Sequence, residues 1–418
     1  MSIVYRVSCP QPTLKGSIIL EPSKSISNRV LIIQSLCKDP FNVHHLSKSD
    51  DTVVLQKMLA SESETLYSGH AGSSYRFMTA KAVLGNREIV LDASEQLRHR
   101  PIGTLVKALQ TIGADISYIN KEGFPPLRIR PSVIGKKVHE VTLQAGFSSQ
   151  YTSALLMIAP CLPEGLTIHL ADDPVSLPYI KMTLSIMEWF GVGHVWEGNT
   201  ITVKHGEYMG KDYMVEADWS AASYYYSAAA LAEKAEIEIV GLPAHSLQGD
   251  SVVKDIYHQF GVETIYTEKG IIIRKIPNHE RIKEFKYDFS PCPDIAQTVM
   301  VTMAGLGIKG VLSGLRTLRI KETDRITAMQ TELARVKTTL ELIGEGPDLI
   351  CKLYGKAKWK DKAKFNTYED HRMAMSFTPL AALHPIVMRD PEVVSKSYPG
   401  FWRDMNAIGI NSERVKMK

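Results

Sequence analysis

The sequence of 418 residues has little of what marks secreted, membrane-spanning or zinc-binding proteins. Its five cysteines are scattered and form no Cys-x-x-Cys pair, which argues against a disulfide framework and against a zinc site. No run of eighteen apolar residues occurs, so no membrane-spanning helix is expected. The first ten residues lack the basic and then apolar layout of a signal peptide. These absences favour a cytoplasmic protein, in a reducing compartment.

The chain also lacks a strong excess of one charge. A net charge of +4 gives no indication of a nucleic-acid partner, but it is compatible with small anionic substrates. The length exceeds that of one ordinary core, so two domains are expected.

A recurring pattern organises the chain into six units. In each unit a short apolar run leads into a small or acidic residue, which then opens an apolar helix. The first two openings are 48 residues apart, and the later intervals are 75, 72, 74 and 76 residues. Such regular spacing indicates a repeated unit. The residues expected to cap these helices are Ser25, Ser73, Ser148, Ser220, Asp294 and Asp370.

The helices of these units are predicted to be buried. Ile295, Val299, Met303 and Leu306 form one apolar stripe at helical spacing, and residues 228–232 are almost all alanine. The sequence therefore predicts an α/β protein with central helices. If the helices of a domain run parallel, their N-terminal ends gather on one face that favours phosphates and carboxylates.

The second unit is predicted to be shortened. Asp50 and Asp51 can cap its helix, and Thr65–Tyr67 reads as a strand. Only residues 60–64 lie between them, which is too few for a β-hairpin. We therefore expect this unit to lack two outer strands that the other units have.

Charged and hydroxyl side chains gather at the helix openings. Lys24, Ser25 and Arg29 begin the first, and Ser25 and Arg29 share a helical face. Residues 148–150 offer two hydroxyls and an amide, which suit either a phosphate or simple capping. Residues 319–325 hold two acids and three bases, with Lys321 and Arg325 expected on one face. Taken singly, each segment could equally be a solvated surface, and no ligand set with metal spacing is present.

In chain order, these motifs together resemble the 5-enolpyruvylshikimate-3-phosphate synthase family over essentially the whole length. The segments that carry the resemblance are residues 24–29, Ala71-Gly72-Ser73 with Arg76, Arg100-Pro101-Ile102-Gly103, Ser148-Ser149-Gln150, residues 176–180, Pro293-Asp294, residues 321–325 and residues 370–375. Two positions depart from the family pattern, since His70 and Thr317 stand where asparagine is usual or frequent.

The resemblance implies the fold and its division. The family has two domains built from six repeated strand-and-helix units, forming an inside-out α/β barrel with helices buried and sheets outside. Carried over, this implies one domain of residues 1–20 and 222–418. The other domain, residues 21–221, is inserted into it and holds the shikimate 3-phosphate site.

The resemblance also implies the reaction. The 5-hydroxyl of shikimate 3-phosphate attacks C2 of phosphoenolpyruvate, whose methylene carbon is protonated, and the tetrahedral intermediate then loses phosphate. Asp294 would be the base at the hydroxyl and Glu322 the proton carrier for carbon. Lys24 would touch both substrates, and His371 would either assist proton movement or orient its neighbours.

The remaining site residues follow from the same resemblance. Phosphoenolpyruvate would be bound by Lys24, Gly72, Arg100, Gln150, Arg325, Arg372 and Lys396. Shikimate 3-phosphate would be bound by Lys24, Ser25, Arg29, Ser148, Ser149, Gln150, Ser176, Tyr179, Asp294, Thr317 and Lys321. No metal and no organic cofactor is expected, because the substrate already carries an activated enol. A monomer is expected, as is inhibition by glyphosate, an anionic competitor of phosphoenolpyruvate in this family.

Two rival functions are weaker. The UDP-N-acetylglucosamine enolpyruvyl transferases share the fold and the donor, but they usually carry a reactive cysteine shortly before an Arg-Pro pair. Residues 91–100 contain no cysteine. A non-catalytic phosphometabolite-binding protein on the same scaffold would not need both Asp294 and Glu322.

Overall fold

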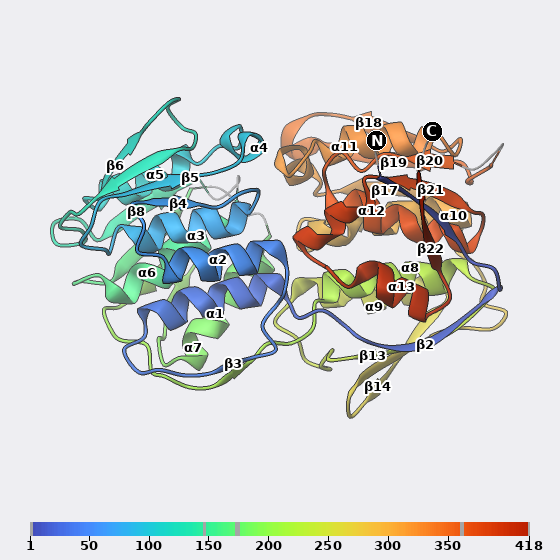
Figure 1. The fold of residues 1–418 in the computed structure, drawn as a ribbon, viewed down its shortest axis with the longest axis horizontal. Helices are drawn as coiled ribbons and strands as arrows, with labels where there is room; N and C mark the ends of the chain where they lie inside the picture. The colour runs from blue at the N-terminus through green and yellow to red at the C-terminus, as the bar shows by residue number, and fades with distance from the viewer. Residues whose placement is uncertain (1–2, 145–147, 172–175, 360–362, 417–418) are drawn as a thin grey trace. The chain divides into compact units, whose positions relative to one another are not determined.

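The computed structural model describes residues 3–144, 148–171, 176–359 and 363–416, in which helices and mixed sheets form an α/β structure (Figure 1). Contacts divide the chain into two compact units. One is Ser23–Val215, and the other combines Met1–Pro22 with Glu216–Lys418. The expected limit after residue 20 lies two residues from the first division. The expected limit after residue 221 lies six residues from the second, inside the helix Trp219–Leu231.

Two four-stranded sheets of the unit Ser23–Val215 share one strand order. The first has the order β4-β5-β7-β6 and the second β8-β9-β11-β10. In both, the first two strands are parallel and the last two form an antiparallel hairpin. The strands are β4 (Thr65–Tyr67), β5 (Ile89–Asp92), β6 (Asp115–Tyr118), β7 (Leu127–Arg130), β8 (Glu140–Leu143), β9 (Leu166–Leu170), β10 (Val195–Glu197) and β11 (Thr200–Val203). Their helices are α3 (Gly72–Ala82), α4 (Glu95–Arg98), α5 (Gly103–Thr111), α6 (Ser149–Ile158) and α7 (Leu177–Trp189).

The other unit holds three sheets of the same pattern. Their orders are β2-β13-β15-β14, β16-β17-β19-β18 and β20-β21-β1-β22. The strands are β1 (Ile3–Ser8), β2 (Thr13–Ile19), β13 (Lys234–Val240), β14 (Val262–Thr267), β15 (Gly270–Lys275), β16 (Glu284–Asp288), β17 (Lys309–Ser313), β18 (Thr339–Ile343), β19 (Ile350–Tyr354), β20 (Ala363–Phe365), β21 (Ile386–Arg389) and β22 (Asn411–Lys416). The helices are α8 (Trp219–Leu231), α9 (Val253–Gln259), α10 (Ala296–Leu306), α11 (Arg325–Ala334), α12 (His371–Phe377) and α13 (Phe401–Ala407). Within the described ranges each sheet is open, and none closes into a barrel.

A sixth sheet is much smaller. It consists of β3 (Val43–His44) and β12 (Tyr213–Met214), which are parallel, and it accompanies α1 (Lys24–Leu36) and α2 (Asp50–Ala60). Residues 61–64, which follow α2, contain no strand. The expected strand Thr65–Tyr67 is present, but it pairs with β5 and so belongs to the next sheet. Sequence spacing did not reveal this assignment, because β3 pairs with a strand that comes about 170 residues later in the chain.

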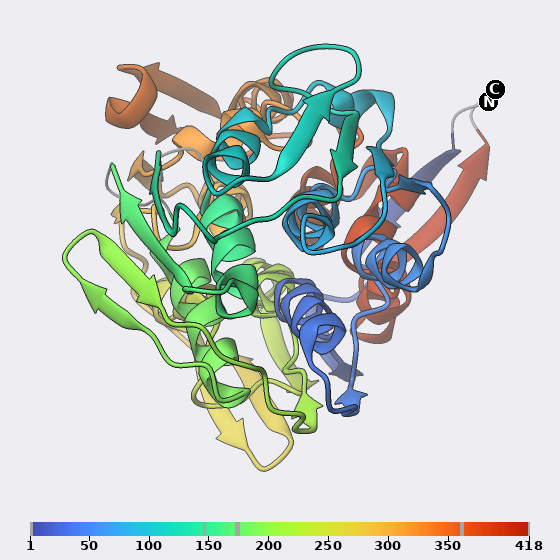
Figure 2. The ribbon, with the colours of Figure 1, turned by 90° about the vertical axis from the view of Figure 1, so that its left-hand side faces the viewer.

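Central helices fill each unit, and their composition explains why. All thirteen residues of α8 and all eleven residues of α10 are buried, and both helices are rich in alanine and other small or apolar residues. Figure 2 shows helices of Ser23–Val215 end-on, with strands of its sheets around them. The apolar stripe expected at Ile295, Val299, Met303 and Leu306 is buried as predicted.

Hydroxyl groups tie the buried helices of the larger unit together. Ser223 on α8 donates to Thr298 on α10 at 3.3 Å, and Thr298 pairs with Ser376 on α12 at 3.1 Å. One turn further along, Thr302 donates to Ser227 at 2.7 Å. Because an unpaired buried hydroxyl is costly, these bonds favour one register of the three helices.

The expected helix caps are correct at two of the six openings. Ser148 caps α6 and Asp370 caps α12, each by accepting a first-turn N–H. The other four expectations were wrong, because the helices begin elsewhere. The N-cap residues are Ser23 for α1, Ala71 for α3, Asp218 for α8 and Ile295 for α10, which follows a short 3-10 turn containing Asp294. Helix α2 also begins earlier than expected, with Ser49 at its N-cap position and Asp50 and Asp51 in its first turn.

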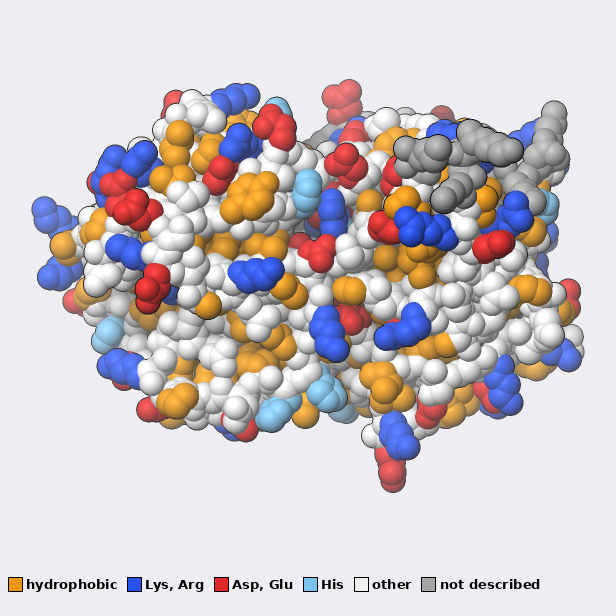
Figure 3. Space-filling model, viewed as in Figure 1, with side chains coloured by type: hydrophobic (Ala, Val, Ile, Leu, Met, Phe, Trp, Pro, Cys, Tyr) orange, Lys and Arg blue, Asp and Glu red, His pale blue; other side chains and the backbone are white. Residues whose placement is uncertain are grey.

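The surface mixes both signs of charge. On the face shown in Figure 3, basic and acidic side chains are interspersed, as the small net charge suggests. No helix among the described residues is both long and apolar enough to cross a membrane. The five cysteines are all free thiols.

Candidate active site

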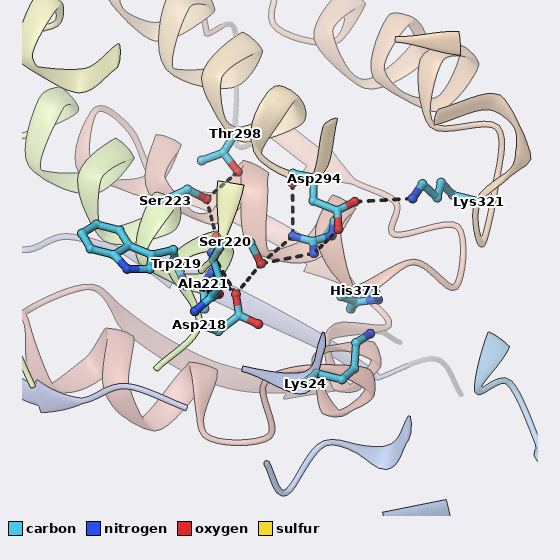
Figure 4. Close-up of polar contacts among 12 residues, drawn as sticks. Lys24, Asp218, Trp219, Ser220, Ala221, Ser223, Asp294, Thr298, Lys321 and His371 are labelled. Atoms are coloured by element: carbon cyan, nitrogen blue, oxygen red, sulfur yellow. Dashed lines mark hydrogen bonds and ion pairs between the residues drawn. The ribbon is translucent and has the colours of Figure 1, made fainter. Parts of the chain in front are cut away.

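Charged side chains lie together near the starts of α10, α11 and α12, in a group called here the Asp294 cluster: Asp294, Lys321, Glu322, Arg325, Asp370 and Arg372. Asp294 Oδ2 accepts a hydrogen bond from Arg372 Nη2 at 3.0 Å. Asp294 Oδ1 lies 3.5 Å from Arg325 Nη1 and 3.7 Å from Lys321 Nζ (Figure 4). One carboxylate therefore faces three cations. Lys321 precedes α11, so it reaches Asp294 from a turn and not, as expected, from a helical face shared with Arg325.

Arg325 is the most enclosed cation of the Asp294 cluster, with a side chain 2% exposed. It donates to both oxygens of Asp370, at 2.7 and 3.3 Å, and to Glu322 Oε2 at 2.8 Å. Burial by itself lowers the pKa of the Arg325 guanidinium, but the carboxylates of Asp370, Glu322 and Asp294 outweigh burial and hold this pKa above its ordinary value. Arg325 thus stays charged, and it links the two carboxylates expected to move protons.

Arg372 is held by α8 as well as by Asp294. Its terminal nitrogens lie 3.2 Å from Ser220 Oγ, and Nη1 also donates to Tyr224 Oη at 3.3 Å. Ser220 gives its only proton to Asp218 Oδ1 at 2.6 Å, so it must accept from Arg372. Asp218 also accepts two N–H groups of the α8 N-terminus. The carboxylate thereby offsets the positive helix end, which would otherwise repel the guanidinium.

Three further residues expected in the site belong to the same unit. His371 is 2% exposed, and its Nδ1 lies 3.9 Å from Asp370 Oδ1. Lys396 Nζ donates to the Glu369 carbonyl at 2.7 Å. Thr317 is buried, and its hydroxyl has no hydrogen-bond partner among the described residues.

In the unit Ser23–Val215, Arg29 is the buried cation. Its guanidinium donates to Thr183 Oγ1 at 2.6 Å, to Ser153 Oγ at 3.0 Å, and to the carbonyls of Ser25 and Tyr179 at 2.8 and 3.4 Å. All four acceptors are neutral. Burial therefore lowers the pKa of Arg29 to about 10. Ser25 and Arg29 share a helical face, as expected.

Lys24, at the start of α1, is paired with Asp51. The two side chains are 3.5 Å apart, and Asp51 also accepts from Ser73 Oγ at 3.1 Å. Asp51 is the residue here that sequence reasoning missed: its place beside Asp50 at a helix start suggested only a cap. Its buried position next to Lys24 depends on the packing of α1 against α2, which no local pattern encodes.

Gly72 lies against two arginines. A Cβ at Gly72 would lie 2.8 Å from Arg100 Nη1 and 2.9 Å from Arg76 Nη1. Arg76 in turn donates to Gln150 Oε1 at 2.8 Å. The absence of a side chain at Gly72 therefore gives both guanidinium groups their room. The sequence prediction named Arg100 and Gln150 as ligands, but it did not connect them through Arg76.

The other expected residues of this unit lie at the starts of α6 and α7. Ser148 Oγ accepts from the Gln150 N–H at 3.2 Å, and Ser149 is buried. Ser176 precedes α7 in the left-handed backbone region, with φ of 57°, and is also buried. Tyr179 lies with its ring 5.9 Å from the Arg29 guanidinium. His70, the departure noted in the sequence, lies 2.9 Å from Ser94 and 3.0 Å from Gln96.

No group of three or more metal-ligating side chains occurs in the part of the chain that the structure describes. The composition of the Asp294 cluster suits proton transfer beside an anionic ligand. Carboxylates can move protons, and arginine forks pair with carboxylates and phosphates.

Comparisons with known proteins identify the family of the chain. The model of the family "EPSP synthase (3-phosphoshikimate 1-carboxyvinyltransferase)" matches residues 54–405. A 3-phosphoshikimate 1-carboxyvinyltransferase of Bacteroides fragilis (strain YCH46) is 42% identical over 411 residues, which cover 97% of this chain and 98% of that protein. The enzyme of the same name from Vibrio campbellii is 32% identical over 96% of this chain and 98% of its own length.

A solved structure extends the comparison to the fold. EPSP synthase from Acinetobacter baumannii superposes with a TM-score of 0.79 at 21% identity, covering 99% of this chain and 100% of that one. At this identity the likeness concerns the fold alone. Since the family model spans most of the sequence and the relatives match it almost from end to end, the chain belongs to the EPSP synthase family.

Proposed function

We propose that the chain transfers the enolpyruvyl group of phosphoenolpyruvate to the 5-hydroxyl of shikimate 3-phosphate and releases phosphate. Its family places this reaction in aromatic amino acid biosynthesis, on the route to chorismate. The observation that carries the proposal is geometric. Asp294 and Glu322, the proposed base and acid, both contact the guanidinium of Arg325, at 3.5 and 2.8 Å.

Asp294 is the proposed base. It would take the proton of the 5-hydroxyl as the oxygen attacks C2 of phosphoenolpyruvate. Three cations favour its carboxylate form, which a base requires, but they also reduce its affinity for a proton. A substrate carboxylate or phosphate on Arg372 would compete with Asp294 for that cation. The exchange would restore basicity at the moment when both substrates are bound.

Glu322 is the proposed acid. It would protonate the methylene carbon and later accept a proton back when phosphate leaves. Its ion pair with Arg325 favours the carboxylate, which has no proton to give. An anionic donor bound to Arg325 would weaken that pair, so we propose that substrate binding lets Glu322 take up its proton. His371 would assist proton movement or orient its neighbours.

The substrate contacts are proposed for each unit separately. In the larger unit, Arg325, Arg372 and Lys396 would bind phosphoenolpyruvate, and Asp294, Thr317 and Lys321 would bind shikimate 3-phosphate. In the unit Ser23–Val215, Gly72, Arg100 and Gln150 would serve phosphoenolpyruvate, and Lys24 and Gln150 would serve both substrates. Shikimate 3-phosphate would further be bound by Ser25, Arg29, Ser148, Ser149, Ser176 and Tyr179.

The finer features of the chain are proposed in the same way. The two compact units would be the two domains of the family, built from six repeats of one strand-and-helix unit arranged as an inside-out α/β barrel. The shared strand order of five sheets supports a common repeat, and the two-stranded sheet would be the shortened one. The protein would act as a cytoplasmic monomer, without a metal or organic cofactor.

The experiment that tests the function is an assay of phosphate release from phosphoenolpyruvate with two acceptors. Release is expected with shikimate 3-phosphate and not with UDP-N-acetylglucosamine. The product should carry the enolpyruvyl group as an ether at the 5-oxygen, which carbon NMR identifies. Binding of both substrates without any phosphate release would contradict the enzymatic function, and release with the nucleotide sugar alone would contradict the acceptor.

A further inference from the structure

A strained turn precedes the segment Asp370-His371-Arg372. Tyr368 and Glu369 both adopt the left-handed backbone region, with φ of 55° and 54°. This region is unfavourable for residues that carry a Cβ, and it is tolerated mainly by glycine, asparagine and aspartate. Two such residues in succession persist only where the surroundings hold them in place.

The buried carboxylate of Glu332, on α11, holds this turn. Its side chain is 0% exposed, and both of its oxygens are used. Oε1 accepts from Tyr368 Oη at 2.6 Å and from Asn366 Nδ2 at 3.4 Å. Oε2 accepts from the Asn366 backbone N–H at 3.1 Å and lies 2.8 Å from Arg335 Nε. One of these four contacts goes to Tyr368 in the turn, and two go to Asn366, two residues before it.

Helix α11 thus contacts residues 366–370 at two points. Arg325 and Glu332 are seven residues apart, which places them on the same face of the helix two turns from each other. Arg325 binds Asp370, directly after the strained turn, while Glu332 binds Asn366 before the turn and Tyr368 within it. The helix that carries a proposed substrate-binding arginine also fixes the backbone next to the other one.

The conformation of the turn also affects the positions of Lys396 and Arg372. The carbonyl of Glu369 accepts from Lys396 Nζ at 2.7 Å. Asp370 Oδ1 accepts the backbone N–H of Arg372 at 2.8 Å and so sets where α12 begins. A relaxed turn would reorient the Glu369 carbonyl and release both residues.

We propose that Glu332 is a positioning residue for phosphoenolpyruvate binding: it holds the Tyr368–Glu369 turn in the conformation that aligns Arg372 and Lys396. This inference rests on the proposed function, which assigns both cations to that substrate. A role in stability alone does not explain the choice of residue. A carboxylate is costly to bury, and a well-packed apolar side chain would serve the core at least as well.

The test begins with Glu332→Gln, which keeps the shape but replaces one acceptor oxygen with an amide donor. In the place of Oε2 the amide nitrogen cannot accept the Asn366 N–H, and in the place of Oε1 it would face the Tyr368 hydroxyl and the Asn366 side-chain amide as a donor. We expect KM for phosphoenolpyruvate to rise about 10-fold, the effect of losing one well-placed hydrogen bond to an ion, with KM for shikimate 3-phosphate nearly unchanged. Amide hydrogen exchange in residues 366–372 should become faster. Tyr368→Phe removes a single contact and should give the same pattern more weakly.

A second substitution can distinguish a loss of the turn conformation from a general loss of structure. Glu369 is exposed, and its side chain makes no hydrogen bond or ion pair in the described structure. Asparagine at this position favours the left-handed region without glycine's flexibility. Adding Glu369→Asn to Glu332→Gln should therefore recover most of the lost affinity for phosphoenolpyruvate. Gln330→Ala, which removes a bond from α11 to the Leu340 carbonyl and not to the turn, should leave both KM values unchanged.

Equal increases in both KM values, or the same increase in Gln330→Ala, would overturn the proposal, as would unchanged exchange in residues 366–372 of the folded Glu332→Gln variant. The exchange measurement needs no substrate. If the parent protein released no phosphate from phosphoenolpyruvate, the proposed function would fail, while the hold of Glu332 on the turn would still be tested.

Discussion

Arg29 and Arg325 are both buried arginines in the first half of a helix, one in each compact unit, yet their partners differ in charge. Arg29 donates to two hydroxyls and two carbonyls, and no acidic group is within ion-pair distance of it in the described structure. Arg325 contacts three carboxylates, those of Asp294, Glu322 and Asp370. Burial alone would lower the pKa of both arginines. It does so for Arg29, to about 10, whereas the carboxylates raise the pKa of Arg325.

This difference in charge indicates which ligands the surroundings of each arginine would bind. A buried cation without a counter-ion is unfavourable until an anion arrives, so the surroundings of Arg29 suit a dianionic phosphate. The Asp294 cluster already carries its own anions. A substrate there must displace them, and displaced carboxylates are free to move protons. We infer that proton transfer belongs to the unit that holds the Asp294 cluster, while the surroundings of Arg29 contribute binding alone.

Among the variants that test this comparison, Glu322→Gln should have the largest effect, which is a loss of turnover. The amide keeps the shape and a hydrogen bond to Arg325, but it cannot protonate carbon. Turnover should fall about 100-fold to 10,000-fold, the usual loss when a general acid is removed. Thr183→Val, which removes a neutral partner of Arg29, should instead raise KM for shikimate 3-phosphate with little change in turnover. Steady-state kinetics measure both, and near-normal turnover in Glu322→Gln would show that the acid lies elsewhere.

Arg325→Met should destabilise the free protein by about 3–5 kcal/mol, because it leaves the carboxylate of Asp370 buried without its partner. Asp370 is 0% exposed, so water cannot replace the guanidinium. Chemical denaturation followed by circular dichroism measures the loss. Adding Asp370→Asn removes the buried charge but retains an oxygen to cap α12, so the double variant should recover part of the stability. No recovery would mean that packing, and not charge, was lost.

Arg29→Met should behave in the opposite way. Thr183 and Ser153 also bond to each other at 2.8 Å, so they keep a partner when the arginine is gone. Stability should stay within about 1 kcal/mol of the parent or increase, because a desolvated charge is removed. Affinity for shikimate 3-phosphate should fall at least about 10-fold. Calorimetric unfolding measures the stability, and calorimetric titration measures the affinity for shikimate 3-phosphate. A stability loss as large as that of Arg325→Met would erase the distinction between the units.

The sequence predicted the segments of the site better than their connections. Motifs at the helix openings identified the EPSP synthase family, and the comparisons confirm that identification. The same reasoning placed the buried stripe of α10 correctly, because a 3.6-residue period is a local property. It failed at four helix starts, where a neighbouring residue such as Ser23 or Asp218 competes for the cap position and only the tertiary path of the chain decides.

Contacts between segments were outside the reach of sequence patterns. The pairs Arg325–Asp370, Lys24–Asp51 and Arg372–Ser220 join residues 45, 27 and 152 positions apart. Each depends on which buried helices pack together. The same limit applies to the two-stranded sheet: the short interval predicted that no hairpin follows α2, and residues 61–64 contain no strand, but β3 and β12 come from opposite ends of their unit.

Gly72→Ala gives the smallest and sharpest test of the unit Ser23–Val215. The added Cβ would meet Arg100 Nη1 at 2.8 Å and Arg76 Nη1 at 2.9 Å, and both are ends of flexible side chains that can shift. Folding should therefore be unaffected, while KM for phosphoenolpyruvate should rise about 3-fold to 10-fold, the worth of one disturbed hydrogen bond. Binding of glyphosate should be weakened more than binding of phosphoenolpyruvate, because the inhibitor is the longer molecule and has less room beside a displaced Arg100. Gly193→Ala is a matched control, since nothing lies within 4 Å of a Cβ at that position. Equal weakening of substrate and inhibitor would place the effect in the charge of Arg100 and not in the space beside it. An unchanged KM would show that the guanidinium groups beside Gly72 tolerate displacement, and the contrast with the Asp294 cluster would then lie in rigidity as well as in charge.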